Sequence, residues 1–491
     1  MINLQKTIQR DILLAGLIVL LSFTVYIFWS VTVEGMGFPL DDAWIHQTYG
    51  RNLGERVQWS FLVDTPSGGS TGPAWGFLIG IVYFLGIPPI LGTFLWGFLF
   101  LWGSTIAAML IFSTIGFSNN ISSLIAGLLI AFEWHIIWAA LSGMETIVLI
   151  FLVLILFYWF LTKKNNWWLP GAIIGFSIWI RPDGLTLLGP AVFILYFRDN
   201  PNPVKIRKLF SLLGSFFILF GLYILFNWIV AGDIWPNTFY AKQAEYAVLR
   251  EVGFGIRYLK VSLQFLTGAG ILLLPGLFLE AKDIVQKKDL ERAAVIIWFL
   301  GYIGIYAWRL PVTYQHGRYI MPAMPVGFII GLAGMMRWIN LQSKIYWRRL
   351  VSGVWIGSTF IVTAAFWFLG ARTYASDVAV IETEMVQPSQ WVRLNTDSSE
   401  VIAAHDIGAL GYFSDRYILD LAGLITPDVI PFIRDEVMLR KYLDQNKVQY
   451  LMTFPDWYPN LIDGLEIAYK SNGKYAPKLG SSNMTLYYWN R

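Results

Sequence analysis

FPLDDAWIHQTYGRNL, residues 38–53, places two adjacent aspartates, Asp41 and Asp42, just after a long apolar opening segment. Charged residues make up only 14% of the 491-residue chain, against roughly a quarter in an average soluble domain. Hydrophobic residues make up 56% and occur in long blocks, which predicts a polytopic α-helical membrane protein. Two carboxylates at a membrane surface therefore need a physical reason.

Short connections between the apolar blocks carry the clustered basic residues. The positive-inside rule places these connections in the cytoplasm, together with the N-terminus, and the apolar run from Ile12 to Val31 is expected to be a retained first span. About eleven transmembrane helices are predicted between them. They lie near 11–31, 91–113, 121–141, 145–161, 168–181, 184–197, 208–230, 264–279, 293–308, 318–337 and 350–370. The net charge is only +4, and the basic residues cluster in these short connections, so no nucleic-acid partner is predicted.

One further apolar segment, 73–89, is short and bounded by Gly72–Pro73 and Pro88–Pro89. Counting it as a span would reverse the side of the later basic connections, so it is predicted to be an interfacial helix. The loop 32–90 and the C-terminal tail then both lie on the extracytoplasmic face of the plasma membrane. Cysteine is absent, which excludes a disulfide framework and a thiolate metal site.

Charge density divides the chain near residue 371. The last 120 residues contain 26 charged residues, and the first 371 contain 42. We therefore expect a transmembrane catalytic domain at 1–371 and a soluble, extracytoplasmic mixed α/β domain at 372–491. Predicted strands lie at 400–405, 416–421, 448–454, 465–470 and 484–489, with helices near 387–395 and 435–446. His405, Asp406 and Asp420 fall at strand ends, where turn and capping roles are favoured over ligand contact.

The chemistry of the aspartate pair follows from its spacing. Adjacent side chains diverge on a helix or a strand, so Asp41 and Asp42 cannot flank one bond as a hydrolytic glycosidase requires. One can face a cavity while the other caps a helix, and Asp42 would suit an N-cap. The alternative is that both are solvated loop charges. Polar neighbours favour a site, namely His46, Gln47, Tyr49, Arg51 and Asn52.

A single carboxylate beside a bilayer suits a single-displacement transfer, in which it takes the proton of an attacking hydroxyl. The leaving group then gains negative charge and needs cationic donors. Predicted phosphate or substrate ligands are His316, Arg318 and Tyr319, and also Lys242 with Asn237 in WPNTFYAK. His46, Tyr49 and Arg51, beside the aspartate pair, are predicted ligands as well. The alternative for each cation is a place at the lipid interface.

Other ionisable residues occur near the outer ends of spans. Glu145 in SGMET could complement a helix N-terminus, or act as a second carboxylate that orients an acceptor or a metal. Glu133 and His135 lie within a span and are expected to line a cavity or to pair with each other. Arg181 and Asp183 in RPDG are expected to form a structural ion pair rather than a catalytic one.

These motifs together resemble the GT-C superfamily of polyprenyl-phosphate-dependent glycosyltransferases, in particular the branch that includes arabinofuranosyltransferase B. The resemblance rests on LDDAWIHQTYGRNL, SGGSTGPAW, LSGMET, RPDG, WPNTFYAK, HGRYIMPAMP, AAHDIGALGYFSDRYILDLAGLITP and FPDWYP. It implies that Asp41 is the general base, supported by Asp42, and that interfacial helices follow the first span. It does not identify the donor sugar.

The expected function is transfer of a sugar from a polyprenyl-phosphate donor to a hydroxyl of a glycan, glycolipid or protein, in cell-envelope assembly. Two alternatives stay open. A transporter or flippase of a lipid-linked saccharide would need polar residues through the depth of the spans and two related halves. A non-catalytic assembly scaffold would tolerate loss of Asp41. A divalent cation is compatible with the transfer but not required, because arginine and lysine can neutralise a phosphate leaving group.

Overall fold

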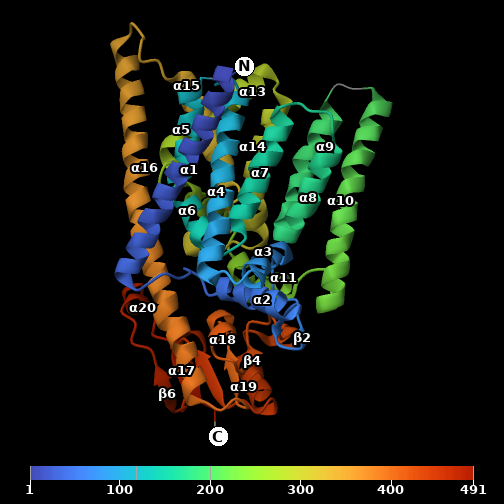
Figure 1. The fold of residues 1–491 in the computed structure, drawn as a ribbon, viewed down its shortest axis with the longest axis vertical. Coiled ribbons are helices and arrows are strands. Elements are labelled where there is room, and N and C mark those ends of the chain that lie inside the picture. Colours follow the sequence, from blue (N-terminus) through green and yellow to red (C-terminus); the bar gives the residue numbers. More distant parts are fainter. Residues whose placement is uncertain (1, 118, 199–200, 490–491) are drawn as a thin grey trace.

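Long apolar helices stand side by side through most of the molecule (Figure 1). The computed structural model describes residues 2–117, 119–198 and 201–489. Within this described part, five helices are long and apolar enough to cross a membrane, or seven if each of two bent pairs forms one span. The five are α1 (Ile2–Val33), α4 (Pro89–Thr114), α10 (Asn202–Ala231), α14 (Leu290–Arg309) and α16 (Tyr346–Ile381).

The two bent pairs break where the sequence interrupts a helix. Between α5 (Asn120–Phe132) and α6 (Trp134–Leu141) the chain turns by 56° at Glu133, whose carboxylate accepts the N–H groups that begin α6. Between α12 (Phe254–Leu266) and α13 (Gly270–Lys287) it turns by 109°, with Gly268 at a φ of +99°. A positive φ of this kind suits glycine alone.

Shorter apolar helices complete the bundle, and the sequence prediction of about eleven spans counted most of them. They are α7 (Thr146–Leu161), α8 (Trp168–Ile180), η1 (Pro182–Leu187) with α9 (Leu188–Phe197), and α15 (Met324–Trp338). The predicted span near 318–337 begins later than expected, because residues 318–323 form turns before α15. Residues 254–263, which lie in no predicted span, form α12 together with the first residues of the span predicted near 264–279.

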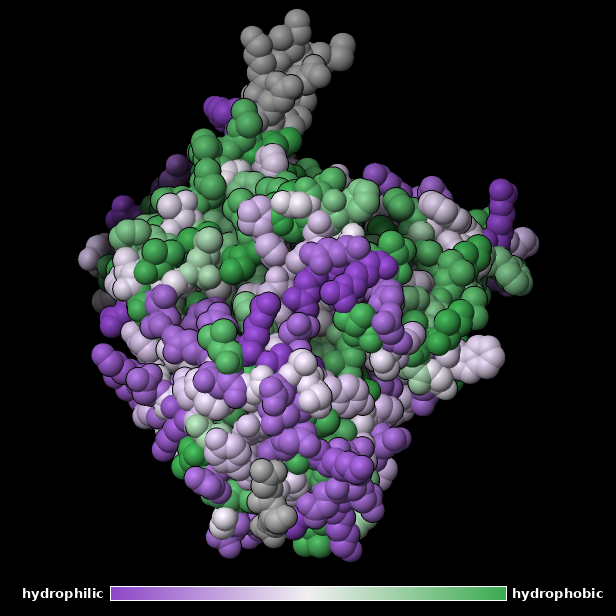
Figure 2. Space-filling model, turned by 60° about the horizontal axis from the view of Figure 1, so that its bottom comes forward, coloured by the Kyte–Doolittle hydropathy of each residue, from purple (hydrophilic) through white to green (hydrophobic). Residues whose placement is uncertain are grey.

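The sides of the bundle are apolar and its C-terminal end is polar. Helix α10, at one edge of the bundle in Figure 1, exposes Phe210, Phe217, Ile218 and Ile229. Seen from the end that carries the C-terminal domain, hydrophobic surface covers the flanks and hydrophilic surface covers the domain (Figure 2). Such apolar flanks suit contact with lipid. The polytopic membrane architecture predicted from the sequence is therefore confirmed.

Three short helices lie between the bundle and the C-terminal domain in Figure 1. They are α2 (Asp42–Arg56), α3 (Pro73–Phe84) and α11 (Asn237–Glu245). The turn that separates α3 from α4 contains Gly86, at a φ of +66°, and α4 begins with proline at its first position. The Pro-bounded segment thus forms its own helix, as the sequence predicts. A small hairpin, β1 (Ser60–Leu62) and β2 (Thr65–Pro66), follows α2.

The C-terminal domain is built on a mixed five-stranded sheet with the strand order β4-β3-β5-β7-β6. β3 pairs in parallel with both β4 and β5, whereas β7 is antiparallel to β5 and β6. The strands are β3 (Val401–Ala404), β4 (Tyr417–Asp420), β5 (Tyr450–Thr453), β6 (Ile467–Lys470) and β7 (Thr485–Tyr488). The α-helices are α17 (Gln387–Asn395), α18 (Gly408–Phe413), α19 (Glu436–Gln445) and α20 (Tyr475–Lys478). The mixed α/β domain is therefore confirmed.

The domain and the bundle share one apolar core. Ile402, Ile407 and Leu410 belong to the same buried cluster as the side chains of α2 and the transmembrane helices. A second cluster, which includes Leu419, Leu439 and Leu451, fills the other face of the sheet. The domain boundary predicted near residue 371 falls inside α16, which continues into η4 (Glu382–Val386), and it stays a prediction. The shared core holds the domain against α2.

Candidate active site

The two aspartates open α2 and point to different partners, as their spacing predicts. Asp41 is the residue before the helix and Asp42 is its first residue, and neither caps the helix N-terminus by a side-chain hydrogen bond. The expected capping role of Asp42 is therefore wrong. Its carboxylate instead meets two cations from distant parts of the chain, while Asp41 meets the C-terminal domain.

Asp41 is buried, with 8% of its surface exposed, and both of its carboxylate oxygens accept backbone N–H groups. Gly408 donates to Oδ2 at 2.7 Å and Ala409 donates to Oδ1 at 2.8 Å. Burial raises the pKa of Asp41 to about 6, against the lowering effect of these two donors. A carboxylate with this pKa can be ionised near neutral pH and still take a proton readily.

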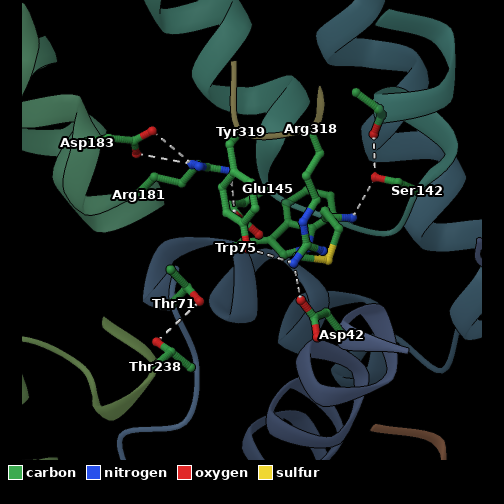
Figure 3. Close-up of polar contacts among 12 residues, drawn as sticks. Asp42, Thr71, Trp75, Ser142, Glu145, Arg181, Asp183, Thr238, Arg318 and Tyr319 are labelled. Atoms are coloured by element: carbon green, nitrogen blue, oxygen red, sulfur yellow. Dashed lines mark hydrogen bonds and ion pairs between the residues drawn. The ribbon is translucent and has the colours of Figure 1, made fainter. Parts of the chain in front are cut away.

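Asp42 holds the two cations that the sequence analysis singled out. Its Oδ2 accepts from Arg318 Nη2 at 2.7 Å and lies 3.4 Å from Lys242 Nζ. Burial alone would raise the pKa of Asp42, but the charges of Lys242 and Arg318 outweigh burial and lower it. Asp42 is thus an anion that fixes both cations in place. Figure 3 shows its contact with Arg318.

Those cations line a cavity of about 500 Å³ between η1, α11 and α14. Its walls combine polar groups with apolar side chains such as Ile305, Leu310 and Phe239. The polar lining residues are Thr71, Glu145, Thr146, Arg181, Asp183, Thr186, Thr238, Lys242, Gln243, Tyr306, Arg309, Arg318 and Tyr319. Arg318 is buried, and its Nη1 has no hydrogen-bond partner among the described residues. An unsatisfied guanidinium nitrogen in a cavity wall is a ready donor for an anion.

Glu145 forms part of the cavity wall and lies close to His46 and Arg181 there. Its Oε2 lies 3.1 Å from His46 Nε2, and its Oε1 lies 3.5 Å from Arg181 Nη1. Burial would raise the pKa of Glu145, but His46 and Arg181 together lower it to about 2. Nδ1 of His46 lies 3.4 Å from the Ser70 hydroxyl. Glu145 therefore holds the wall together as an anion, which fits an orienting role.

The RPDG ion pair also borders the cavity. Arg181 Nε donates to Asp183 Oδ1 at 3.1 Å, and Tyr306 donates its hydroxyl to Asp183 Oδ2 at 2.6 Å. Tyr302 donates to the same oxygen. Figure 3 shows Arg181 turned toward Asp183, while Arg318 reaches Asp42 beside the Tyr319 ring. The sequence analysis expected the pair itself but not its place in the cavity wall.

Glu133 and His135 pair with each other, as one of the two sequence alternatives expects. Glu133 Oε1 lies 2.7 Å from His135 Nδ1, and the Thr267 hydroxyl lies 3.0 Å from the other ring nitrogen. Both side chains are buried. The pair stands at the α5–α6 break, where it connects that break to the loop after α12.

Four residues predicted as ligands have structural partners elsewhere. Nε2 of His316 lies 2.7 Å from Asp377, the Tyr49 hydroxyl accepts from Gly69 N–H at 2.9 Å, and Arg51 donates to the Tyr412 carbonyl at 2.9 Å. Asn237 donates to the Leu424 carbonyl at 3.2 Å. None of the four lines the described cavity. Their ligand roles stay predictions, whereas Arg318, Tyr319 and Lys242 come together at one wall.

The residues between β3 and α18 lie close to the aspartates. Asp406 is partly buried, and burial and the charge of Asp41 raise its pKa to about 8. His405 Nε2 lies 3.4 Å from Glu245 on α11. The sequence analysis missed this proximity, because strand-end positions carry no signal of their distant neighbours. No group of three or more His, Asp or Glu side chains placed to hold a metal ion occurs within the described residues.

Comparisons with known proteins bear on the fold. A family model described as a domain of unknown function (DUF8728) matches residues 370–487, and no curated protein matches the chain. The apo oligosaccharyltransferase of Archaeoglobus fulgidus is similar in structure, with a TM-score of 0.59 and 11% identity over 89% of this chain and 69% of that one.

Two further solved structures share the fold. ArnT of Cupriavidus metallidurans bound to undecaprenyl phosphate has a TM-score of 0.56 and 12% identity, over 96% of this chain and 97% of that one. The arabinofuranosyltransferase AftD of Mycobacteria has a TM-score of 0.53 and 14% identity, over 96% of this chain and 40% of that one. Assignment to the arabinofuranosyltransferase B branch stays a prediction. The fold of this chain is the GT-C fold of these membrane glycosyltransferases.

Proposed function

We propose that this protein is an integral-membrane glycosyltransferase that moves a sugar from a polyprenyl-phosphate donor to an acceptor hydroxyl. The proposed site lies on the extracytoplasmic face, where the bundle meets the C-terminal domain. The observation that carries the proposal is the buried Arg318, which shares Asp42 with Lys242 and leaves Nη1 free at the wall of the cavity.

The donor phosphate would sit against these two cations. Arginine offers a planar fork of donors to phosphate oxygens, and lysine adds a compact positive charge. The apolar part of the cavity wall, with Ile305, Leu310 and Phe239, suits the first isoprene units of the lipid. The similarity to ArnT, whose structure was determined with undecaprenyl phosphate bound, supports a lipid phosphate as the ligand class.

Transfer would proceed in one displacement. The acceptor oxygen attacks the anomeric carbon while Asp41 takes its proton, and the bond from that carbon to the phosphate oxygen breaks. The lipid phosphate leaves with the electron pair, and Arg318 and Lys242 stabilise its negative charge. A single displacement inverts the anomeric centre. General-base assistance of this type contributes roughly 10²- to 10⁴-fold to the rate.

The arrangement of polar groups favours an enzyme over a transporter. The aspartates, the cations and the cavity gather at the end of the bundle beside the C-terminal domain. A transporter of the same substrate needs a polar path through the depth of the membrane. The donor sugar and the acceptor are not identified by these contacts.

The test is turnover of purified protein in lipid nanodiscs with a panel of polyprenyl-phosphate sugars. We expect release of polyprenyl phosphate with one donor class, and a loss of at least about 100-fold in Asp41→Asn. A control is Asp463→Asn, which changes an acidic residue of the C-terminal domain placed outside the proposed site. Release by Asp41→Asn at the wild-type rate would refute the base assignment, and no release with any donor would favour a non-catalytic scaffold.

A further inference from the structure

Residues 405–409 form a link that connects β3 to the first turn of α18. Both ends of this link contact residues outside the C-terminal domain. At its end, the N–H groups of Gly408 and Ala409 donate to the Asp41 carboxylate at 2.7 and 2.8 Å. At its start, His405 Nε2 lies 3.4 Å from Glu245 at the end of α11. The tyrosine hydroxyl of Tyr458 lies 2.8 Å from His405 Nδ1. The link therefore connects the C-terminal domain to α2, which carries Asp42, and to α11, which carries Lys242.

The approach of the link to Asp41 is close enough to require glycine at position 408. A Cβ atom added to Gly408 would lie 2.0 Å from the Asp41 carbonyl oxygen and 2.8 Å from Oδ2. Neither is a tolerable contact, and the nearest atom belongs to the backbone of α2's first turn. A side chain at 408 would therefore push the two N–H donors away from the carboxylate.

Further contacts between α18 and α2 help to hold the Gly408 and Ala409 N–H donors in position. The Trp44 ring packs against Tyr412 and Phe413 with centroids 4.9 and 4.7 Å apart. Arg51 donates to the Tyr412 carbonyl at 2.9 Å, and its guanidinium lies 4.5 Å from the centre of the Tyr412 ring. Tyr83 donates to the Tyr412 hydroxyl at 2.9 Å. These contacts fix α18 to α2 and, through Tyr83, to α3.

We propose that residues 405–409 are a positioning element for Asp41, so that the C-terminal domain is a working part of the catalytic centre. This rests on the proposed function. A carboxylate offers about four lone-pair positions. The two backbone donors occupy one on each oxygen and hold the ionised form, which leaves the remaining positions for the acceptor hydroxyl. Residues 405–409 of the C-terminal domain thereby orient the carboxylate of Asp41, the proposed general base.

Several charged groups around Asp41 bear on its titration. Asp42 on α2 raises the pKa of Asp41, and His405 on the link lowers it. Asp406 also faces Asp41 from the link, and His46, Lys242 and Arg318 act through Asp42. Glu245 faces the link at His405. Only the Gly408 and Ala409 N–H groups bond the Asp41 carboxylate directly within the described residues, so loss of a donor should change its titration most specifically.

The test compares Ala409→Pro with Ala409→Gly in the full-length protein. Proline removes the N–H at the second position of α18, where a helix makes no bond of its own, and glycine keeps it. We expect Ala409→Pro to shift the acid limb of the pH–rate profile upward by about one pH unit, which lowers kcat/KM about twofold at pH 7 and about tenfold at pH 5. Ala409→Gly should keep the acid limb of the wild type. The dissociation constant for undecaprenyl phosphate should not change, because Arg318 and Lys242 are untouched.

A second pair of variants distinguishes a local effect on Asp41 from general misfolding. Gly408→Ala should produce the same upward shift, whereas Gly357→Ala, at a position of α16 where an added Cβ meets nothing within 4 Å, should behave as the wild type. A folded Ala409→Pro protein with the wild-type limb and rate would overturn the proposal. If Ala409→Pro lowers the unfolding temperature strongly, a double-mutant cycle with Asp41→Ala decides. The two losses should be less than additive if the link holds Asp41, and additivity would overturn it.

The two proposals fail in different ways. No release of polyprenyl phosphate by the wild type, with undecaprenyl phosphate still bound, would refute the transferase and the positioning of its base together. In that case the double-mutant cycle of Asp41→Ala and Ala409→Pro, measured by thermal unfolding, would still report whether the link holds the Asp41 carboxylate. Transfer by the wild type with identical pH profiles in all four variants would refute the positioning role alone.

Discussion

Arg318 and Asp42 lie 276 positions apart in the chain and meet at 2.7 Å, between Nη2 and Oδ2. The same guanidinium leaves Nη1 without a partner among the described residues. One nitrogen is thus held by the protein, and the other is unpaired in a side chain that lines the cavity. A buried arginine that is fixed but not saturated can bind an anion without first losing its own anchor, which keeps the entropic cost of binding low.

Replacing Arg318 by glutamine should weaken binding of undecaprenyl phosphate roughly 10- to 100-fold, because a hydrogen bond to a charged group contributes about 1.5–3 kcal/mol. The measurement is a titration of the lipid phosphate into protein in nanodiscs. Arg372→Gln, at an exposed position of α16, is the matched control. Equal affinities of the two variants would rule out Arg318 as the phosphate ligand.

Glu145→Gln should lower the free energy of unfolding by about 3 kcal/mol, since it removes the anion that pairs with two buried cations or cation-forming groups. These are His46 at 3.1 Å and Arg181 at 3.5 Å. Thermal unfolding of the purified variant checks this, with Asp41→Asn measured beside it. Unchanged stability together with abolished turnover would instead give Glu145 a direct catalytic role.

Asp406→Asn should stabilise the protein increasingly as pH rises from 5 to 8. Burial and Asp41 raise the pKa of Asp406 in the folded protein from 3.8 to about 8. Between these values the folded chain holds a proton that the unfolded chain has lost, so the wild type loses stability as pH rises. The asparagine variant lacks this titration. The difference in unfolding temperature between the two proteins should therefore grow with pH, and a constant difference would contradict the assignment.

Arg51→Ala should loosen the C-terminal domain more than Tyr412→Phe does. The arginine change removes a hydrogen bond to the Tyr412 carbonyl and the guanidinium above its ring. The phenylalanine change removes only the hydroxyl contact with Tyr83. Losses of about 1–3 kcal/mol and about 1 kcal/mol respectively are expected. Limited proteolysis and thermal unfolding measure both, and the reverse order would show that Arg51 does not anchor α18.

Local patterns predicted much of the fold. The five tail strands and the helices at 387–395 and 435–446 follow from alternation and helical periodicity, and their observed bounds differ from the predicted ones by a few residues. The Pro-bounded helix α3 follows from its flanking residues. Each of these signals lies within a short window of sequence, which is why they are readable without coordinates.

Such patterns do not predict contacts between residues that lie far apart in the sequence. GALGYF lies outside the predicted helices of the tail, yet it forms α18, and the N–H of its first residue donates to a carboxylate 367 positions away. His316 looked like a ligand beside Arg318, but its neighbour turns to the cavity while it bonds Asp377. These two residues, with only Gly317 between them, have different partners because the backbone turns there, where His316 has a φ of +57°. Composition and spacing do not carry that information.

The most direct test of the central claim is a structure of the full-length protein in nanodiscs with undecaprenyl phosphate. We predict phosphate density within about 3 Å of Arg318 Nη1 and beside Lys242 Nζ, with the lipid chain leaving along Ile305 and Leu310. A phosphate bound elsewhere, with the Arg318 nitrogen still unpaired, would contradict it.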